Sequence, residues 1–117
     1  MVSRKDQIKD ILIRARNILK PEGVWIKGAF HSKSNGQDSY CMLGALNAAC
    51  FGEEYYRRHI MYPMLKYEVQ EAARTILGDI LEEKVGTRSV ASFNDNVKTE
   101  KSDVIDIFNL AIERVEN

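Results

Sequence analysis

The chain has 117 residues, which at about 100 to 200 residues per domain is enough for one domain with one core. Leu, Ile, Val and Phe supply 31 of them, more than the roughly one-fifth that is typical of disordered chains, so we expect a globular fold. Seventeen basic and 17 acidic side chains cancel, which argues against a protein that binds nucleic-acid phosphates through its overall charge.

Two further features predict the compartment. No stretch approaches the roughly 18 consecutive apolar residues of a membrane span, and the first six residues resemble a charged helix start rather than a signal peptide. Cys41 and Cys50 lie nine positions apart, which on one helix would place them on opposite faces and about 13.5 Å apart along the axis. We therefore expect two free thiols in a cytoplasmic protein that does not associate with membranes.

The first predicted helix covers residues 3–20. Its apolar residues recur at helical spacing, and Ser3 followed by Asp6 indicates a capped start. Pro21 and Gly23 then end the helix, because proline cannot continue the hydrogen-bond ladder and glycine accepts a left-handed turn.

An irregular segment and a central helix follow. Residues 24–30 contain Trp25 and could hold a minor strand, and the polar residues after them predict a loop with a turn at Asn35-Gly36. Residues 40–51 are apolar or small nearly all round, so this helix, capped by Asp38 or Ser39, should be central to the core.

The rest of the chain predicts further helices. Residues 53–61 suggest a short helical turn, and Pro63 suits the first turn of a long helix that ends between residues 78 and 83. The apolar side chains of this helix, starting with Met64 and Leu65, are predicted to face the core. Residues 90–95 predict one short turn of helix, and Thr99 caps a last helix that runs to about residue 115. The whole chain, 1–117, is thus expected to be a single all-α domain, a compact single-core bundle of four main helices plus one or two short ones.

Three short motifs in a fixed order carry a resemblance. They are Trp25-x-x-Gly28-Ala29, Cys41-x-x-Gly44-Ala45 and Asn94-Asp95-x-x-x-Thr99. Together they resemble a family of uncharacterised small helical proteins of bacteria and their phages, over nearly the whole chain. The resemblance implies the helical fold but no reaction or ligand, since the family is a domain of unknown function.

Cys41 is the candidate nucleophile. In the first turn of a helix, the unpaired N–H groups and the macrodipole would lower the pKa of its thiol, while His31 could act as base and Asp95 or Asn94 as orienting group. The chain would then be a Cys41-dependent hydrolase or transferase. The alternative, which we favour, is a small buried residue, because the local signatures of cysteine enzymes are missing.

A metal site is not expected. His31, Cys41, Cys50 and His59 could supply zinc ligands, but no two of them have the close spacing that places a ligand pair on one element. We expect neither a metal nor another cofactor.

Two segments could form a ligand pocket. Trp25, Lys27, Gly28 and Phe30 could build an aromatic wall with close backbone approach, or Trp25 could simply cover the core while Gly28 serves a turn. The Asn94-Asp95 pair could present a polar cluster to the same pocket, or form only a turn before the cap at Thr99.

A local basic patch is the third candidate feature. Arg57 and Arg58 lie among tyrosines, and residues 4–20 hold six basic side chains against two acidic ones. Such a patch could bind nucleic acid, but charge runs on helices are usually solvated faces.

We therefore predict a small non-enzymatic binding protein, one version of which is phage-derived and sequesters a host protein or a small signalling molecule. Its partner is an unidentified protein or small molecule, nucleic acid is not favoured, and two copies could pair. The predicted ligand-binding residues are Trp25, Lys27, Gly28, Cys41, Asn94, Asp95 and Thr99.

Overall fold

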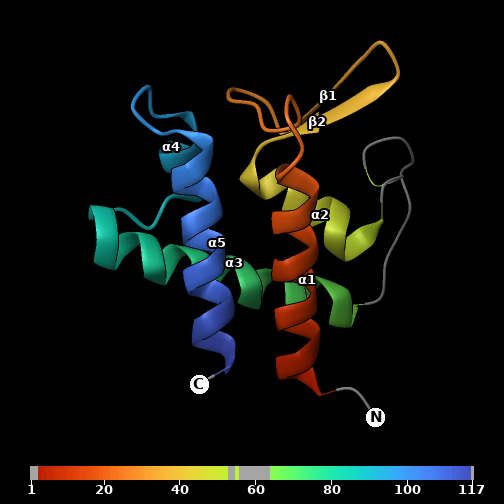
Figure 1. Cartoon of the computed structure of the whole chain (residues 1–117). Coiled ribbons are helices and arrows are strands. Elements are labelled where there is room, and N and C mark those ends of the chain that lie inside the picture. The colour runs from red at the N-terminus through yellow and green to blue at the C-terminus, as the bar shows by residue number, and fades with distance from the viewer. Residues whose placement is uncertain (1–2, 53–54, 56–63, 117) are drawn as a thin grey trace.

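The computed structural model describes residues 3–52, 55 and 64–116. Within them the fold is mostly α, as predicted, with four long helices, one short helix and a two-stranded antiparallel sheet (Figure 1). The elements are α1 (Arg4–Leu19), β1 (His31–Ser34), β2 (Gln37–Tyr40), α2 (Met42–Phe51), α3 (Met64–Val85), α4 (Val90–Asp95) and α5 (Lys101–Glu116).

The helices pack in two directions. Helices α1 and α5 lie side by side and antiparallel, so that both ends of the chain are on the same side of the molecule (Figure 1). Helix α3 crosses behind and contacts both of them, and α2 packs against α1 and α3. The hairpin and α4 lie at the end of the bundle opposite the termini.

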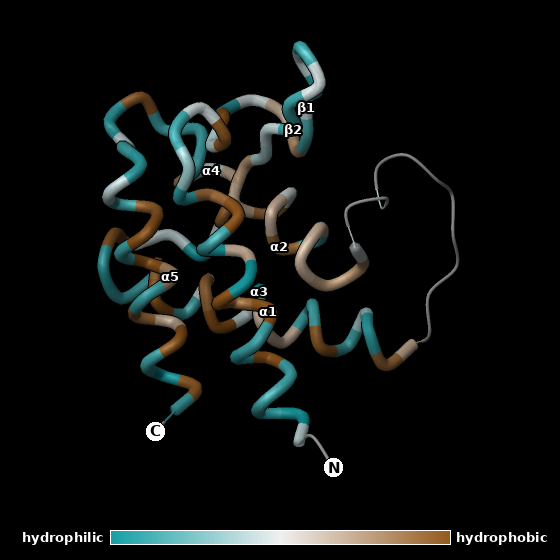
Figure 2. Tube along the Cα trace, turned by 45° about the vertical axis from the view of Figure 1, so that its right-hand side comes forward, coloured by the Kyte–Doolittle hydropathy of each residue, from teal (hydrophilic) through white to brown (hydrophobic). Residues whose placement is uncertain are grey.

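The core lies where these helices cross. Along α1 and α5 hydrophobic and hydrophilic residues alternate at helical period, whereas α2 is apolar along most of its length (Figure 2). Seven of the ten residues of α2 are buried, which confirms its predicted central position. The largest fully buried apolar side chains are Leu12, Leu19, Met42, Leu46, Leu77, Leu81, Val104 and Phe108.

The ends of α1 match the prediction. The Ser3 hydroxyl accepts the Asp6 N–H at 3.1 Å, and Lys20 closes the helix with its N–H on the Arg16 carbonyl. Pro21 follows directly, so both ends of this helix lie where the local sequence signals predicted them.

The predicted polar loop is a β-hairpin. His31 pairs with Tyr40 and Ser34 with Gln37, and the turn is at Asn35-Gly36 as predicted, with both residues at positive φ. The strand expected near residues 24–30 is reduced to a single parallel bridge between Trp25 and Tyr40. The hairpin is stable because this third segment and the bundle support strands that would be marginal alone.

Helix α2 begins later than predicted. It starts at Met42 with Cys41, not Asp38 or Ser39, as its N-cap, because residues 37–40 are taken up by β2. The Cys41 sulfur accepts the Gly44 N–H at 3.3 Å, the role that a serine or aspartate oxygen usually performs.

The boundaries of α3 and α5 also differ from the prediction. Helix α3 continues past Gly78 to Val85, because Gly86 at positive φ ends it. Gly78 instead lets the Arg88 backbone approach, since a Cβ there would lie 3.1 Å from the Arg88 carbonyl oxygen. Helix α5 begins at Lys101, so Thr99 is not its cap, and Asp103 accepts the Glu100 N–H at 2.9 Å.

The start of α3 is more exposed than predicted, and most of the segment before it lies outside the described residues. Met64 and Leu65 were expected to face inward but are exposed, because α3 extends beyond α1 and α2 at that end. The predicted turn at 53–61, apart from Tyr55, and the roles of Pro63, Arg57, Arg58 and His59 lie outside the described residues. Among the helices that are described, none is long and apolar enough to span a bilayer.

The closest backbone approach joins α2 to the segment before the hairpin. Gly44 is buried, and a Cβ there would overlap the Phe30 carbonyl oxygen. That oxygen also accepts the Cys41 N–H at 3.3 Å, so the carbonyl is held in place and cannot move aside cheaply. Gly44 is therefore required for packing rather than for backbone conformation.

We predict that Gly44→Ala lowers the free energy of unfolding by about 2 kcal/mol or more, because the overlap with backbone outweighs the better helix propensity of alanine. Urea denaturation measures the change. Gly78→Ala is the matched control, since it gains the same propensity but meets its neighbour at 3.1 Å and should cost less. Equal effects of the two substitutions would contradict this assignment.

Candidate functional site

The site is built around Asn94, near the end of α4. This side chain is 1% exposed and uses both ends of its amide. Its Oδ1 accepts the Trp25 indole N–H at 2.7 Å and the Met42 backbone N–H at 3.0 Å. Its Nδ2 donates to the Ile26 carbonyl and to Asp95 Oδ1, each at 3.0 Å. Asn94 thus joins the segment before the hairpin, the start of α2 and α4.

Asp95 lies beside this network at the surface. Its Oδ1 accepts the Gly28 N–H at 2.9 Å in addition to the Asn94 amide. The hydrogen bond from the Gly28 backbone, followed by that from Asn94, lowers the pKa of the Asp95 carboxyl. The carboxylate is therefore held in one orientation and stays ionised at neutral pH.

Trp25 and Lys27 fix the other side of the network. Trp25 is half-buried and packs against the core, so it covers the core as one of the two interpretations predicted. The Lys27 ammonium lies 5.4 Å from the centroid of the Trp25 ring and donates to the Asn96 carbonyl at 2.6 Å. Both side chains tie the segment before the hairpin to the end of α4.

Cys41 faces the same region from the start of α2. It is buried, and burial raises the pKa of its thiol, with the nearby Asp95 charge acting in the same direction against the backbone hydrogen bonds. The expectation of a lowered pKa is therefore wrong for this site, because desolvation outweighs the helix terminus. The thiol is neutral at physiological pH.

His31 lies in the hairpin and interacts there. Its Nε2 is 2.8 Å from Asp38 Oδ1, and its ring lies 5.1 Å from that of Tyr40. Among the described residues Cys41 makes no hydrogen bond to His31. Cys41 and His31 are therefore not joined by the hydrogen bond that links a nucleophile to its general base.

A small pocket opens between these residues. Its volume is about 150 Å³, and most of its wall is apolar. Asp95 and Gly28 are at its surface, whereas Asn94 and Cys41 form its buried side. The lining residues are Gly28, Ala29, Phe30, Cys41, Leu43, Ala91, Asn94 and Asp95.

The structure brings most of the predicted ligand-binding residues together. Trp25, Lys27, Gly28, Cys41, Asn94 and Asp95 form one connected site, but Thr99 lines a different groove. Sequence reasoning placed Phe30 in the predicted aromatic wall but missed Leu43 and Ala91. Ala91 carried no signal, because only the tertiary packing of α4 on α2 brings it beside the Cys41 motif. Leu43 lies within that motif, where the apolar pattern of the helix indicated only a place in the core.

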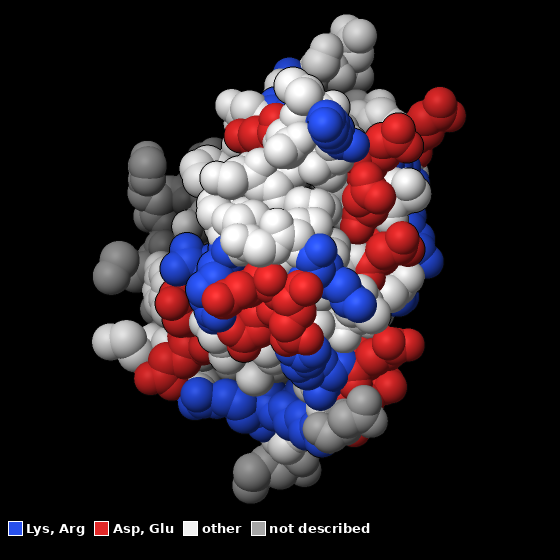
Figure 3. Space-filling model, turned by 90° about the vertical axis from the view of Figure 1, so that its left-hand side faces the viewer, with Lys and Arg blue, Asp and Glu red and all other residues white. Residues whose placement is uncertain are grey.

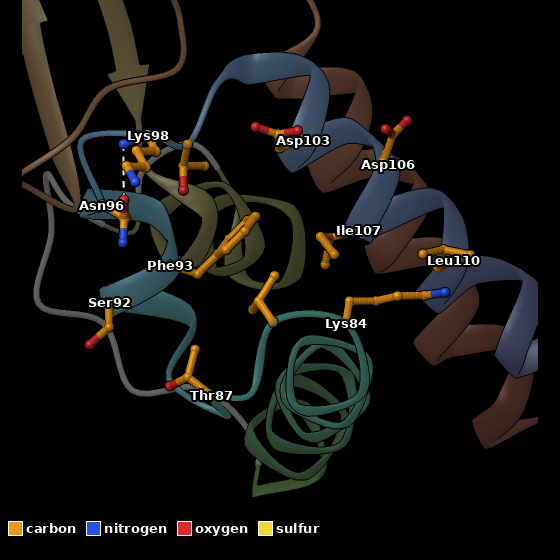
Figure 4. A pocket seen from close by; sticks show the side chains of 12 residues that line it. Lys84, Thr87, Ser92, Phe93, Asn96, Lys98, Asp103, Asp106, Ile107 and Leu110 are labelled. Atoms are coloured by element: carbon orange, nitrogen blue, oxygen red, sulfur yellow. Dashed lines mark hydrogen bonds between the residues drawn. The ribbon is translucent and has the colours of Figure 1, made fainter.

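The second groove is larger and was not predicted. It lies between the end of α3, α4 and α5, and has a volume of about 810 Å³ (Figure 4). Its residues are spread over several segments of the sequence, and only Thr99 is one of the motif residues identified in the sequence. They are Lys84, Val85, Thr87, Ser92, Phe93, Asn96, Lys98, Thr99, Asp103, Asp106, Ile107 and Leu110.

Metal ligands do not gather in the part of the chain that the structure describes. No group of three or more His, Cys, Asp or Glu side chains there could hold an ion. Cys41 and Cys50 are separate free thiols, as expected. The Cys50 thiol donates to the Lys66 carbonyl at 3.3 Å.

The architecture defines a small helical protein with one hairpin and a buried asparagine network at the hairpin end. The chain belongs to DUF6197, a family of unknown function whose model matches residues 3–114. The match confirms the resemblance to a domain of unknown function. No curated protein and no solved structure matches the chain.

We predict that Asn94→Ala lowers the free energy of unfolding by about 3 kcal/mol or more, because the Met42 N–H, the Trp25 N–H and the Ile26 carbonyl lose their partner together. Urea denaturation, monitored by Trp25 fluorescence, measures the change in the free energy of unfolding. Asn109→Ala is the control: its amide is exposed and, among the described residues, bonds only Arg16, so the free energy of unfolding should change by no more than about 0.5 kcal/mol. A loss of unfolding free energy no larger than that of Asn109→Ala would contradict the central role of Asn94.

Alkylation tests the state of Cys41. We predict that iodoacetamide at pH 7 modifies Cys41 much more slowly in the folded protein than in urea, because the thiol is buried and its pKa is raised. Mass spectrometry of the peptides, with half-buried Cys50 as internal comparison, gives both rates. Fast alkylation of Cys41 below neutral pH would instead restore the nucleophile hypothesis.

Proposed function

We propose that this protein is a small non-enzymatic binding protein whose Asp95 pocket receives one cationic side chain of a protein partner. The observation that carries the proposal is a fixed carboxylate at the mouth of a small apolar pocket. Asp95 Oδ1 is held by Gly28 and Asn94, while the pocket behind it is lined mainly by apolar atoms.

The size of the pocket favours a side chain over a whole small molecule. About 150 Å³ corresponds to roughly five water molecules, whereas pockets for drug-sized ligands occupy about 300 to 1,000 Å³. An alkyl stem fits such a space. Of the two partner classes expected from the sequence, a host protein is therefore better supported than a signalling molecule.

The charge of the pocket favours a cationic end group. The lowered pKa keeps Asp95 ionised, and Oδ2 accepts no hydrogen bond from any described residue. A lysine or arginine head could bind this oxygen while its stem contacts Cys41 and Leu43. Phe30, which is 55% exposed, lies at the rim as an apolar contact for the partner.

The thiols and the family resemblance support a cellular location and an origin for this proposal. Two free thiols suit a reducing compartment, which supports a cytoplasmic protein. A phage protein that sequesters a host protein is the specific version of this proposal, and its support is the resemblance of the chain to bacterial and phage proteins.

No observation favours the two other candidate functions. The enzyme hypothesis needs a reactive thiol beside a base, and Cys41 is buried and makes no hydrogen bond to His31 in the described contacts. The nucleic-acid hypothesis needs free basic side chains on α1, where Arg4, Lys9 and Arg14 are in ion pairs. Arg57 and Arg58 are outside the described residues.

Side-chain analogues test the pocket directly. We expect n-butylammonium or methylguanidinium to shift the amide resonances of Gly28, Cys41 and Asp95 in a saturable way in ¹H–¹⁵N NMR titrations, because each cation can bind Asp95 and fill the apolar space. Uncharged n-butanol should give weaker shifts, since it lacks the charge that the carboxylate attracts.

Asp95→Asn is the matched variant. Its Oδ1 can still accept the Gly28 N–H and the Asn94 amide, so the network persists while the negative charge is removed. We expect the variant to lose the preference for the cations over n-butanol. A variant that binds the cations as well as the wild type, or a wild type that shows no saturable shift, would refute the proposal.

A further inference from the structure

The larger groove between α3, α4 and α5 contains a hydroxyl group that the fold does not use. Thr99 is 8% exposed and lines the groove. Its N–H donates to the Asn96 carbonyl, but its hydroxyl makes no hydrogen bond to any described residue. No buried side-chain oxygen or nitrogen of the described residues lacks a partner, so this hydroxyl is accessible from the groove and is available to a ligand.

The floor of the groove is apolar. Phe93 from α4 and Ile107 from α5 point toward each other across it (Figure 4), and both are at least nine-tenths buried. Val85 at the end of α3 is 52% exposed and extends the apolar surface outward. An apolar group of a ligand could therefore displace water from the apolar part of this groove.

The rim carries charges of both signs. Lys98 follows α4, Asp103 and Asp106 lie on α5, and Lys84 reaches across from the end of α3 (Figure 4). No ion pair joins any two of these four, although the same helices form other pairs, such as Arg88 with Asp79 and Arg114 with Glu83.

The surface view agrees with this arrangement. On the side where α3 ends, an uncharged area is bordered by acidic side chains along one edge, by basic side chains above it, and by both acidic and basic side chains below it (Figure 3). A ligand with one sign of charge would meet repulsion at part of this rim, whereas a ligand with both signs would be complementary to it.

We propose that this groove binds a zwitterionic small molecule with an apolar body, of the size and chemistry of an apolar dipeptide. Its ammonium group would bind Asp103 and Asp106, and its carboxylate would bind Lys98 and the amide group of Asn96. The apolar body would cover Phe93 and bring a polar group to the Thr99 hydroxyl. The volume of about 810 Å³ lies within the range of small-molecule sites.

The probe is the dipeptide L-leucyl-L-phenylalanine. We expect saturable shifts of the amide resonances of residues 84–110 in ¹H–¹⁵N NMR titrations of the whole protein, with a dissociation constant that calorimetry can confirm. The N-acetylated dipeptide and the dipeptide amide each lack one charge, and we expect each to bind at least threefold more weakly than the zwitterion.

Two variants assign the contacts. Thr99→Val keeps the shape of the side chain but removes the hydroxyl, and should weaken binding about threefold to tenfold. Asp106→Asn changes an exposed residue, so it should leave the fold intact even where Thr99→Val proves unstable. It should weaken binding of the dipeptide at least threefold but leave binding of the N-acetylated form unchanged. Asp95→Asn, in the other pocket, is the control and should bind the dipeptide as the wild type does.

The outcomes separate clearly. Saturable binding that both charged groups of the dipeptide and Asp106 strengthen would support the site. No saturable shift up to the solubility limit of the dipeptide would overturn it, and so would equal binding of all three dipeptide forms or an unchanged Asp106→Asn variant. Because Asp95→Asn leaves this groove intact, failure here is distinguishable from failure of the proposed function.

Discussion

The arrangement of this protein depends on one buried amide. Asn94 is the point where the segment before the hairpin, the N-terminus of α2 and α4 meet, and its two acceptor and two donor contacts satisfy groups from all three. Backbone and indole groups at this depth would be costly without partners. An aspartate or a leucine of similar size could not replace it, because neither can accept and donate at once. The short helix α4 is therefore fixed by polar contacts as well as by Val90 and Phe93.

The same residues explain why Cys41, although it lies at a helix N-terminus, is expected to be unreactive. The position of Cys41 before α2 supplies the N–H groups that stabilise a thiolate elsewhere, but the side chain is turned inward and its sulfur caps Gly44. Desolvation then dominates, and the fixed Asp95 carboxylate adds to it. The thiol acts as a capping group and as one wall of the pocket, while the charge of the site resides on Asp95.

The sequence predicted those features that depend on neighbours along the chain. Ser3 with Asp6, Pro21 and the Asn35-Gly36 turn are local signals, and each was located correctly. The hairpin was missed because its strands are polar and short, and it is stabilised by the distant Trp25 segment and by α2. Gly78 was mistaken for a helix end since only the folded Arg88 backbone explains a glycine there. Thr99 was taken for a cap, although it lies one residue before the actual cap position and faces a groove between α3, α4 and α5. Of the candidate site, the polar residues and the aromatic residues Trp25 and Phe30 were predicted, whereas the aliphatic wall of Leu43 and Ala91 was not.

The antiparallel packing of α1 and α5 has a practical consequence. The two helices start and finish at one end of the bundle, where Lys9 and Glu116 form an ion pair, while the hairpin, α4 and the Asp95 pocket occupy the other end (Figure 1). An affinity tag, a fluorophore or a surface linker attached at either terminus would thus leave the pocket facing away from the attachment point. Two different labels could also be placed on the two termini to report on separation of α1 from α5 without touching the asparagine network.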